Sequence, residues 1–179
     1  MGMPGCVTRS QQNFQTTGCS ITVCLAIPLW SHRANVRRAA LPIAAALVAG
    51  SCTAVAVALA IGKAMGLSPQ MLATLAPKST TAPVALGISQ SLGGSPTLTA
   101  VLVVLTGMVG AVVITPMMNA LRISDWRARG LAVGVAAHGI GTARALQVNP
   151  QAGAFAGIGM ALNAIATALL APWLLSLFL

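Results

Sequence analysis

The stretch that decides the fold is LAVGVAAHGIGTARAL, residues 131–146. It is apolar enough to lie in a membrane, yet it contains five residues of another kind: His138, Gly139, Gly141, Thr142 and Arg144. Hydrocarbon offers no water to unpaired backbone groups, so a glycine-broken segment is tolerated there only inside protein or beside a cavity. An intramembrane histidine or arginine is also a candidate functional residue by default. The segment therefore predicts one half of a polar centre.

The composition of the whole chain indicates a membrane protein. Hydrophobic residues make up 56% of the 179 residues, charged residues make up 6%, and the mean hydropathy is +0.86. Soluble domains carry about 25% charged residues, which keep their surface hydrated. This chain has too few charges for such a surface. It is therefore predicted to be an all-α, multi-pass integral membrane protein with spans of about 20 residues.

The net charge of +9 arises from ten basic residues and a single acid, Asp125. The basic residues stand in short loops between apolar runs, as is typical of cytoplasmic loops that face anionic lipid. Aromatic residues are only 3%, with no Tyr, which leaves little to stack on bases. We predict a lipid bilayer as partner and no nucleic acid. A helical count places Asp125 near Arg122 and Arg129, as a local ion-pair partner.

Catalytic and metal-binding patterns are missing from the sequence. The four cysteines form no CxxC pair and have no histidine at zinc-finger spacing, so neither a metal nor a disulfide is predicted. With one acid there is no set of nucleophile, base and acid. We expect no enzyme activity and no cofactor.

The N-terminal region differs from the rest of the chain. Residues 1–20 are polar, and without an apolar h-region they are predicted to be a tail and not a signal peptide. Residues 21–30 are apolar but too short to span a bilayer. This half-length run suggests that the start of the protein has been lost or replaced. The membrane domain is predicted to occupy residues 21–179.

A second broken stretch, residues 68–90, lies between the full spans predicted at 39–62 and 96–121, and a third full span is predicted at 152–178. A proline removes an N–H group and obstructs the preceding turn, so Pro77 and Pro83 should break the helix. The break gathers one ammonium and three hydroxyls in an apolar setting: Lys78, Ser79, Thr80 and Thr81. These groups predict a polar site, and the alternative is an ordinary loop between two helices.

Charge placement predicts the path of the chain. The basic loops at 31–38 and 122–129 fall on the same, inner side only if residues 68–90 are re-entrant, dipping in and returning. The sequence TAPVAL at 81–86 also resembles TARAL at 142–146, and each is followed by a span ending near a proline. The two units would enter from opposite sides, as in an inverted-topology repeat whose broken helices meet near mid-membrane.

Four segments in order then resemble one family: PKSTTAPVALGIS at 77–89, ITPMM at 114–118, residues 127–146 and residues 153–174. Together they resemble the LrgB/CidB family from about residue 21 to the end. The resemblance implies a bacterial inner-membrane protein, antiholin-like or holin-like, that modulates murein hydrolase activity and lysis with a small LrgA/CidA-type membrane partner. Plant relatives are plastid glycolate/glycerate translocators, which implies carboxylate transport.

The chain also departs from that family pattern. Its first twenty residues match nothing in the family, and the usual upstream spans are absent. Gln147 stands where relatives often carry an acid, so an acidic partner for Arg144 is missing.

The candidate substrate-binding residues are Lys78, Ser79, Thr80, Thr81, His138, Gly139, Gly141, Thr142, Arg144 and Asn163. Half-helix N-termini and the two cations would attract a small monocarboxylate, and the hydroxyls would bind substrate hydroxyls. His138 would couple transport to protons, and the glycines would admit the ligand close to the backbone. The alternatives are that Arg144 snorkels to the interface, that His138 bonds a carbonyl, and that Asn163 bonds a neighbouring helix.

Three interpretations of what the protein does stay open at this stage. The first is an antiholin-like modulator of murein hydrolase activity and lysis that is also a carrier of small carboxylates such as glycolate. The second is a purely regulatory partner of a holin-like LrgA/CidA-type protein. The third is a non-functional fragment. A homo-oligomer is compatible with each of them.

Overall fold

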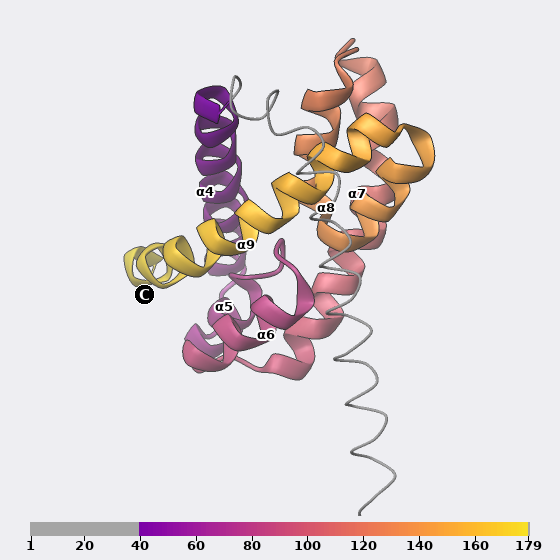
Figure 1. The fold of residues 1–179 in the computed structure, drawn as a ribbon. Helices are drawn as coiled ribbons and strands as arrows, with labels where there is room; N and C mark the ends of the chain where they lie inside the picture. Colours follow the sequence, from indigo (N-terminus) through magenta and orange to yellow (C-terminus); the bar gives the residue numbers. More distant parts are fainter. Residues whose placement is uncertain (1–39, 179) are drawn as a thin grey trace, which may run out of the picture.

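The computed structural model describes residues 40–178, which contain helices and no strand. Six helices follow one another in this part of the chain: α4 (Ala40–Ala64), α5 (Pro69–Leu75), α6 (Ala82–Ser91), α7 (Pro96–Ala120), α8 (Trp126–Val148) and α9 (Pro150–Phe178). Figure 1 shows their arrangement. The predicted tail, the apolar run at 21–30 and the basic loop at 31–38 lie outside the described residues.

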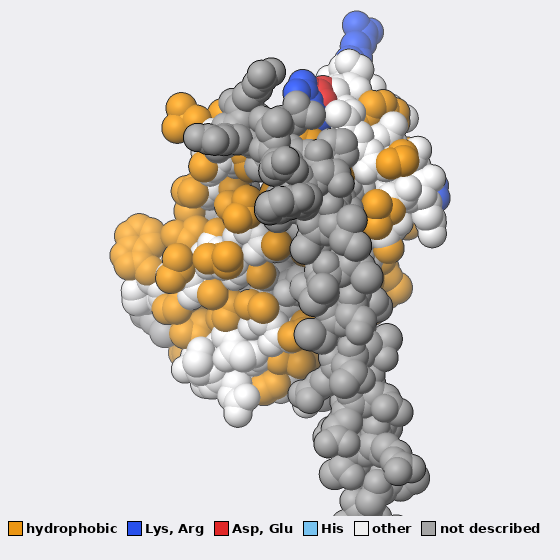
Figure 2. All heavy atoms as spheres, viewed as in Figure 1, with side chains coloured by type: hydrophobic (Ala, Val, Ile, Leu, Met, Phe, Trp, Pro, Cys, Tyr) orange, Lys and Arg blue, Asp and Glu red, His pale blue; other side chains and the backbone are white. Residues whose placement is uncertain are grey.

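Three of these helices are long and apolar enough to cross a membrane: Leu41–Ala64 within α4, Pro96–Ala120 and Pro150–Phe178. They match the three spans predicted from the sequence. In its most apolar window α7 is only 22% buried, whereas α9 is 56% buried. The helix α9 is therefore the central one, and α7 turns most of its apolar surface outward. Figure 2 shows apolar side chains spread over the visible surface, with the charged ones mainly towards one end.

Small residues let α8 and α9 pack closely, and this pair has the most extensive contact of the fold. Gly130 and Gly134 on α8 lie against the carbonyl groups of Ala152 and Ala156 on α9. A side chain at either glycine would collide with a backbone oxygen. Both pairs have the small-xxx-small spacing that brings membrane helices together where hydrophobic burial gives no driving force.

The predicted break at residues 77–83 is present, because α5 ends at Leu75 and α6 begins at Ala82. Ser68 caps α5 with its hydroxyl oxygen, which accepts from the amide of Met71 at 3.4 Å. Pro83 lies in the first turn of α6, where its missing N–H leaves no bond unmade. The proline-rich segment thus becomes two short helices joined by residues 76–81.

A hydroxyl cluster ties this hairpin to α7. The Thr99 hydroxyl lies 2.7 Å from the Ser89 hydroxyl and 3.0 Å from the Thr74 carbonyl. The Ser95 amide donates to the Thr74 hydroxyl at 2.9 Å. Thr74, Ser89 and Thr99 are all fully buried. Their mutual bonds satisfy them, so this cluster is structural.

The helix α8 reverses direction at His138. That residue has φ 38° and ψ −131°, which no helix contains. In a straight helix Trp126 and Val148 would be about 33 Å apart, yet both line one small pocket. The residues before His138 (126–137) and after it (139–148) therefore form a helical hairpin. We call them the first and second halves of α8.

The α5–α6 hairpin and the α8 hairpin lie at opposite ends of α7. Figure 1 shows the start of α4 and the end of α7 at one end of the molecule, with α5 and α6 at the other. The hairpin of α8 begins and ends beside the C-terminal turns of α7, since Trp126 and Val148 share a pocket with Ile114 and Met118. Re-entry into a bilayer and an inverted repeat stay predictions.

The predicted ion pairing of Asp125 with Arg122 and Arg129 is wrong. Asp125 is the N-cap of α8, and its carboxylate accepts from the Arg127 amide at 2.8 Å and pairs with the Arg127 guanidinium at 2.9 Å. A helical count fails here because the cap residue is extended, so its side chain folds back over the first turn. The bond from Arg127 holds the pKa of Asp125 below its ordinary value.

Candidate functional site

The side chain of Asn163 joins the two broken segments. Its amide nitrogen donates to the Ser79 carbonyl in the α5–α6 connection at 2.9 Å and to the Val135 carbonyl in α8 at 3.3 Å. In a continuous helix the Val135 carbonyl would accept from the amide of Gly139, and the reversal at His138 interrupts that run. Asn163 therefore supplies a donor to each break, and it is only 1% exposed.

The other side of the same amide group binds α4 and α9. The Asn163 oxygen accepts from the Ser51 hydroxyl at 2.6 Å and lies 3.4 Å from the Thr167 hydroxyl. A carboxamide has two donors and two acceptor positions, and here all four have partners within the chain. Asn163 thus acts as a junction between four segments and has no bonding position left over.

The connection between α5 and α6, residues 76–81, is called the first break here, and it presents groups that lack such partners. The Thr80 side chain is fully buried, and its hydroxyl has no hydrogen-bond partner among the described residues. Lys78 is partly buried, and its ammonium donates to the Ser79 hydroxyl at 3.2 Å. Thr81 is the N-cap of α6, yet its side chain makes no capping bond. This break combines one ammonium, two uncommitted hydroxyls and the amino end of a helix.

The second break is the reversal of α8 at His138, and it is packed against α7. The ring of His138 is 4% exposed, and its Nε2 lies 3.0 Å from the Val103 carbonyl. Gly107 makes room for the ring, because a Cβ there would lie 2.6 Å from His138 Cε1. The two breaks meet at Asn163, whose amide nitrogen bonds a backbone carbonyl from each of them.

The neighbours of His138 have different surroundings. The Thr142 hydroxyl donates to the His138 carbonyl at 2.7 Å, so it is satisfied within α8. A Cβ at Gly141 would lie 2.5 Å from Ala137 Cβ, so the tight reversal itself requires glycine there. A Cβ at Gly139 would meet only the sulfur of Met160, at 4.0 Å.

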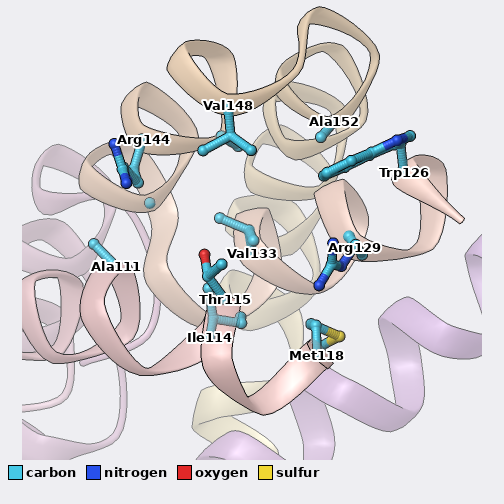
Figure 3. Close-up of a pocket in the computed structure, with 12 residues that line it drawn as sticks. Ala111, Ile114, Thr115, Met118, Trp126, Arg129, Val133, Arg144, Val148 and Ala152 are labelled. Carbon is cyan, nitrogen blue, oxygen red and sulfur yellow. The ribbon is translucent and has the colours of Figure 1, made fainter. Parts of the chain in front are cut away.

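Arg144 lies with Gly141 at a pocket that is separate from His138 and from the first break. It is exposed and donates to the Gln147 side chain at 3.4 Å. Because the second half of α8 returns towards its start, Arg144 lines a pocket with Trp126 and Arg129 (Figure 3). This pocket includes neither His138 nor any residue of the first break.

Several residues of the junction were not anticipated from the sequence. Ser51 and Val103 lie in spans that are predominantly apolar, and Gly107 is one of many glycines. The two hydroxyl residues in the middle of the apolar span at 39–62, Ser51 and Thr53, were the one available signal for Ser51. Nothing in the sequence marks a backbone carbonyl such as that of Val103 as a partner for His138.

Three candidate spans, an apolar outer surface and two interrupted helices that meet on a buried amide define an all-helical membrane protein. Within that class, the chain belongs to the LrgB-like family, whose pattern matches residues 18–177.

The curated relatives agree with this membership. The chain is 35% identical over 156 residues to the holin-like protein CidB of Staphylococcus aureus, an alignment that covers 87% of this chain and 68% of the relative. It is 36% identical over 155 residues to the uncharacterized protein YwbG of Bacillus subtilis, covering 87% and 69%. An uncharacterized protein of Haemophilus influenzae is 35% identical over 160 residues, covering 89% and 69%. No solved structure matches the chain.

Proposed function

We propose that this protein is a non-enzymatic carrier of small monocarboxylates in the bacterial inner membrane, with its binding site at the first break. The carboxylate would lie between the ammonium of Lys78 and the amino end of α6. Free N–H groups and the partial positive charge of a helix N-terminus suit an anion. The hydroxyls of Thr80 and Thr81 would bind its other oxygens.

The observation that carries this proposal is the lack of a counter-ion for Lys78. The only acid in the sequence is Asp125, which is bonded to Arg127 on the exposed turn that opens α8. A partly buried ammonium in a membrane segment is costly unless a negative charge joins it. Two residues further along, the buried hydroxyl of Thr80 has no hydrogen-bond partner within residues 40–178, and such an unmade bond costs about 1–3 kcal/mol. A bound carboxylate would relieve both costs.

The other predicted residues would take separate roles. Asn163 would hold the two breaks together, because its bonds are all used within the chain. His138 would link the site to α7 through the Val103 carbonyl. Its imidazole would bind and release the proton that is transported with the substrate. Arg144 would not contact the substrate, since it lies at the pocket that excludes the first break.

A second candidate function is control of lysis. The relatives named holin-like CidB support a protein that modulates murein hydrolase activity together with a small LrgA/CidA-type membrane protein. This role needs an exposed apolar face for the partner, and α7 offers one in Val101, Val104, Leu105, Met108 and Val112. The two functions are compatible, because carboxylate flux can feed a regulatory response.

Uptake of labelled glycolate or pyruvate into proteoliposomes tests the carrier. We expect Lys78→Gln to lower uptake at least about tenfold, since a charge-assisted bond to a carboxylate contributes about 1.5–3 kcal/mol. Lys63→Gln is the matched control, because Lys63 bonds the Phe178 carbonyl at the far end of α4. Uptake that is equal in Lys78→Gln, Lys63→Gln and the unaltered protein would remove the site.

A regulatory protein without transport would give a different result. Liposomes containing the unaltered protein would then show no uptake above empty liposomes. Co-purification with the LrgA/CidA-type partner would persist in Lys78→Gln and would be lost when charged residues are placed on α7, as in Val104→Glu.

A further inference from the structure

The pocket beside Arg144 lies apart from the proposed carboxylate site and has its own chemistry. Its walls come from the last turns of α7, both halves of α8 and the start of α9, and they are mostly apolar, with Ile114, Val133 and Val148 among them. Two arginines, Arg129 and Arg144, lie on opposite sides of it, as Figure 3 shows. Its volume of about 30 Å³ holds two or three water molecules or a short piece of an apolar chain.

Neither arginine has an acidic partner. Arg129 donates to the Asn119 side chain and lies over the Trp126 ring, 5.0 Å from its centre. Among the described residues, Arg144 donates only to the neutral side chain of Gln147. The single acid of the sequence is bonded to Arg127, so two full positive charges remain uncompensated around one apolar pocket. A guanidinium has five N–H donors, and both groups keep donors for a further ligand.

The pocket lies near the C-terminal end of the candidate span α7. The α7 residues that line it, from Ala111 to Met118, precede the end of that helix at Ala120 by about 3–14 Å at 1.5 Å per residue. Trp126, which also lines it, is a residue type that favours the membrane–water interface. The exposed apolar side chains of Val112, Val113 and Met117 continue outward from it on α7. Basic groups above an apolar surface at the end of a span attract anionic lipid.

We propose that this pocket binds one anionic phospholipid, whose phosphate lies between Arg129 and Arg144 and whose first methylene groups enter the apolar pocket. The phosphate accepts hydrogen bonds from both guanidinium groups, in the bidentate manner that arginine permits. The lipid then links the two halves of α8, because Arg129 belongs to the first and Arg144 to the second. The proposal does not depend on carboxylate transport.

Native mass spectrometry of the purified protein with mixed phosphatidylglycerol and phosphatidylcholine tests the site. The unaltered protein should retain phosphatidylglycerol in preference, and the double variant Arg129→Gln/Arg144→Gln should lose about tenfold of that retention. The double variant Arg122→Gln/Arg127→Gln removes the same charge at the same end but outside the pocket lining. It should retain the lipid within about twofold.

Two further measurements separate the alternatives. Thr115→Leu narrows the pocket without changing its charge, so it should also lower retention while the helix content stays unchanged by circular dichroism. Inorganic phosphate at millimolar concentration should not raise the thermal stability of the lipid-free protein. Equal retention of the two lipids, equal losses in the two double variants, or stabilisation by inorganic phosphate alone would overturn the proposal.

Discussion

Two interruptions of apolar helices can be compared: the connection between α5 and α6, and the reversal inside α8. In each, a backbone carbonyl accepts a hydrogen bond from the Asn163 side chain. They differ in how the interruption is made. Prolines unwind the first over six residues, 76–81, and the buried Thr80 hydroxyl there has no partner in the part of the chain that the structure describes. The second is made at one residue, His138, whose ring and carbonyl are bonded by Val103 and Thr142.

This difference implies different roles: the first break has groups available for a ligand, whereas the second only turns the chain. Unmade hydrogen bonds in a dry interior cost free energy that a ligand can recover. A satisfied break has nothing to offer a ligand, and its backbone strain can be kept only where the surroundings enforce it. We therefore expect substitutions at the first break to change binding and those at the second to change stability.

The largest expected effect is at the residue that the two breaks share. Asn163→Leu leaves the Ser79 and Val135 carbonyls and the Ser51 hydroxyl without their partner. We expect a loss of about 2–4 kcal/mol in the free energy of unfolding, measured by denaturant titration in micelles. Thr167→Val is the control, since Thr167 makes only a 3.4 Å bond to the same group. A loss as small as that of the control would mean that the breaks are not held by this amide.

The second effect concerns the backbone at His138. In an ordinary helix glycine is about 1 kcal/mol less stable than alanine. A φ of 38° favours glycine instead. We expect His138→Gly to exceed His138→Ala in stability by about 1–2 kcal/mol, whereas Ala136→Gly, two residues earlier, should destabilise. The usual order at residue 138 would show that the reversal there carries no strain. Thermal unfolding of the three variants decides this.

A smaller effect compares one hydroxyl from each break. Thr80→Val removes a buried hydroxyl that has no partner, so stability should rise by about 1 kcal/mol while carboxylate binding falls. Thr142→Val removes a hydroxyl that donates to the His138 carbonyl, so stability should fall by about 1 kcal/mol. Scanning calorimetry of both variants measures the two signs. If stability changed in the same direction in both variants, the two breaks would not differ in how their hydroxyls are satisfied.

The smallest effect belongs to neither break. The Arg127 bond lowers the folded pKa of Asp125, so its contribution to stability is present above the unfolded pKa of about 3.9 and is lost as pH falls through the folded value. Asp125→Asn should remove this pH dependence below about pH 4, and because the pair is exposed the change should be slight. Asp125→Ala also loses the cap, at about 1 kcal/mol. Unfolding curves at pH 7 and pH 3.5 compare the three proteins.

Much of the fold follows from local sequence. Long apolar runs predict the three candidate spans, because only a helix satisfies its own backbone in hydrocarbon. Pro77 and Pro83 predict the first break, because proline cannot continue a helix from the preceding turn. The glycines around His138 predict a broken segment, and a break is present at His138 itself.

The candidate site was only partly predictable from the sequence. The structure brings Ser79 and Asn163 together, because the Asn163 amide bonds the Ser79 carbonyl of the first break as well as the Val135 carbonyl next to the second. The separation of Arg144 could not be foreseen, because it depends on the direction of the chain after His138. The backbone conformation at His138 decides whether residues 139–148 continue the direction of the first half of α8 or turn back along it. Residue types do not encode that conformation.

The sequence by itself determined that this chain is a helical membrane protein, where its helices break and which polar residues lie in them. Those properties depend on hydropathy and on the covalent geometry of proline, which act within a few residues. The tertiary structure alone decided that one amide joins both breaks, that Thr80 is left unpaired and that Arg144 faces Arg129 across a pocket. Each of these depends on contacts between distant segments, which form only when all the helices pack together.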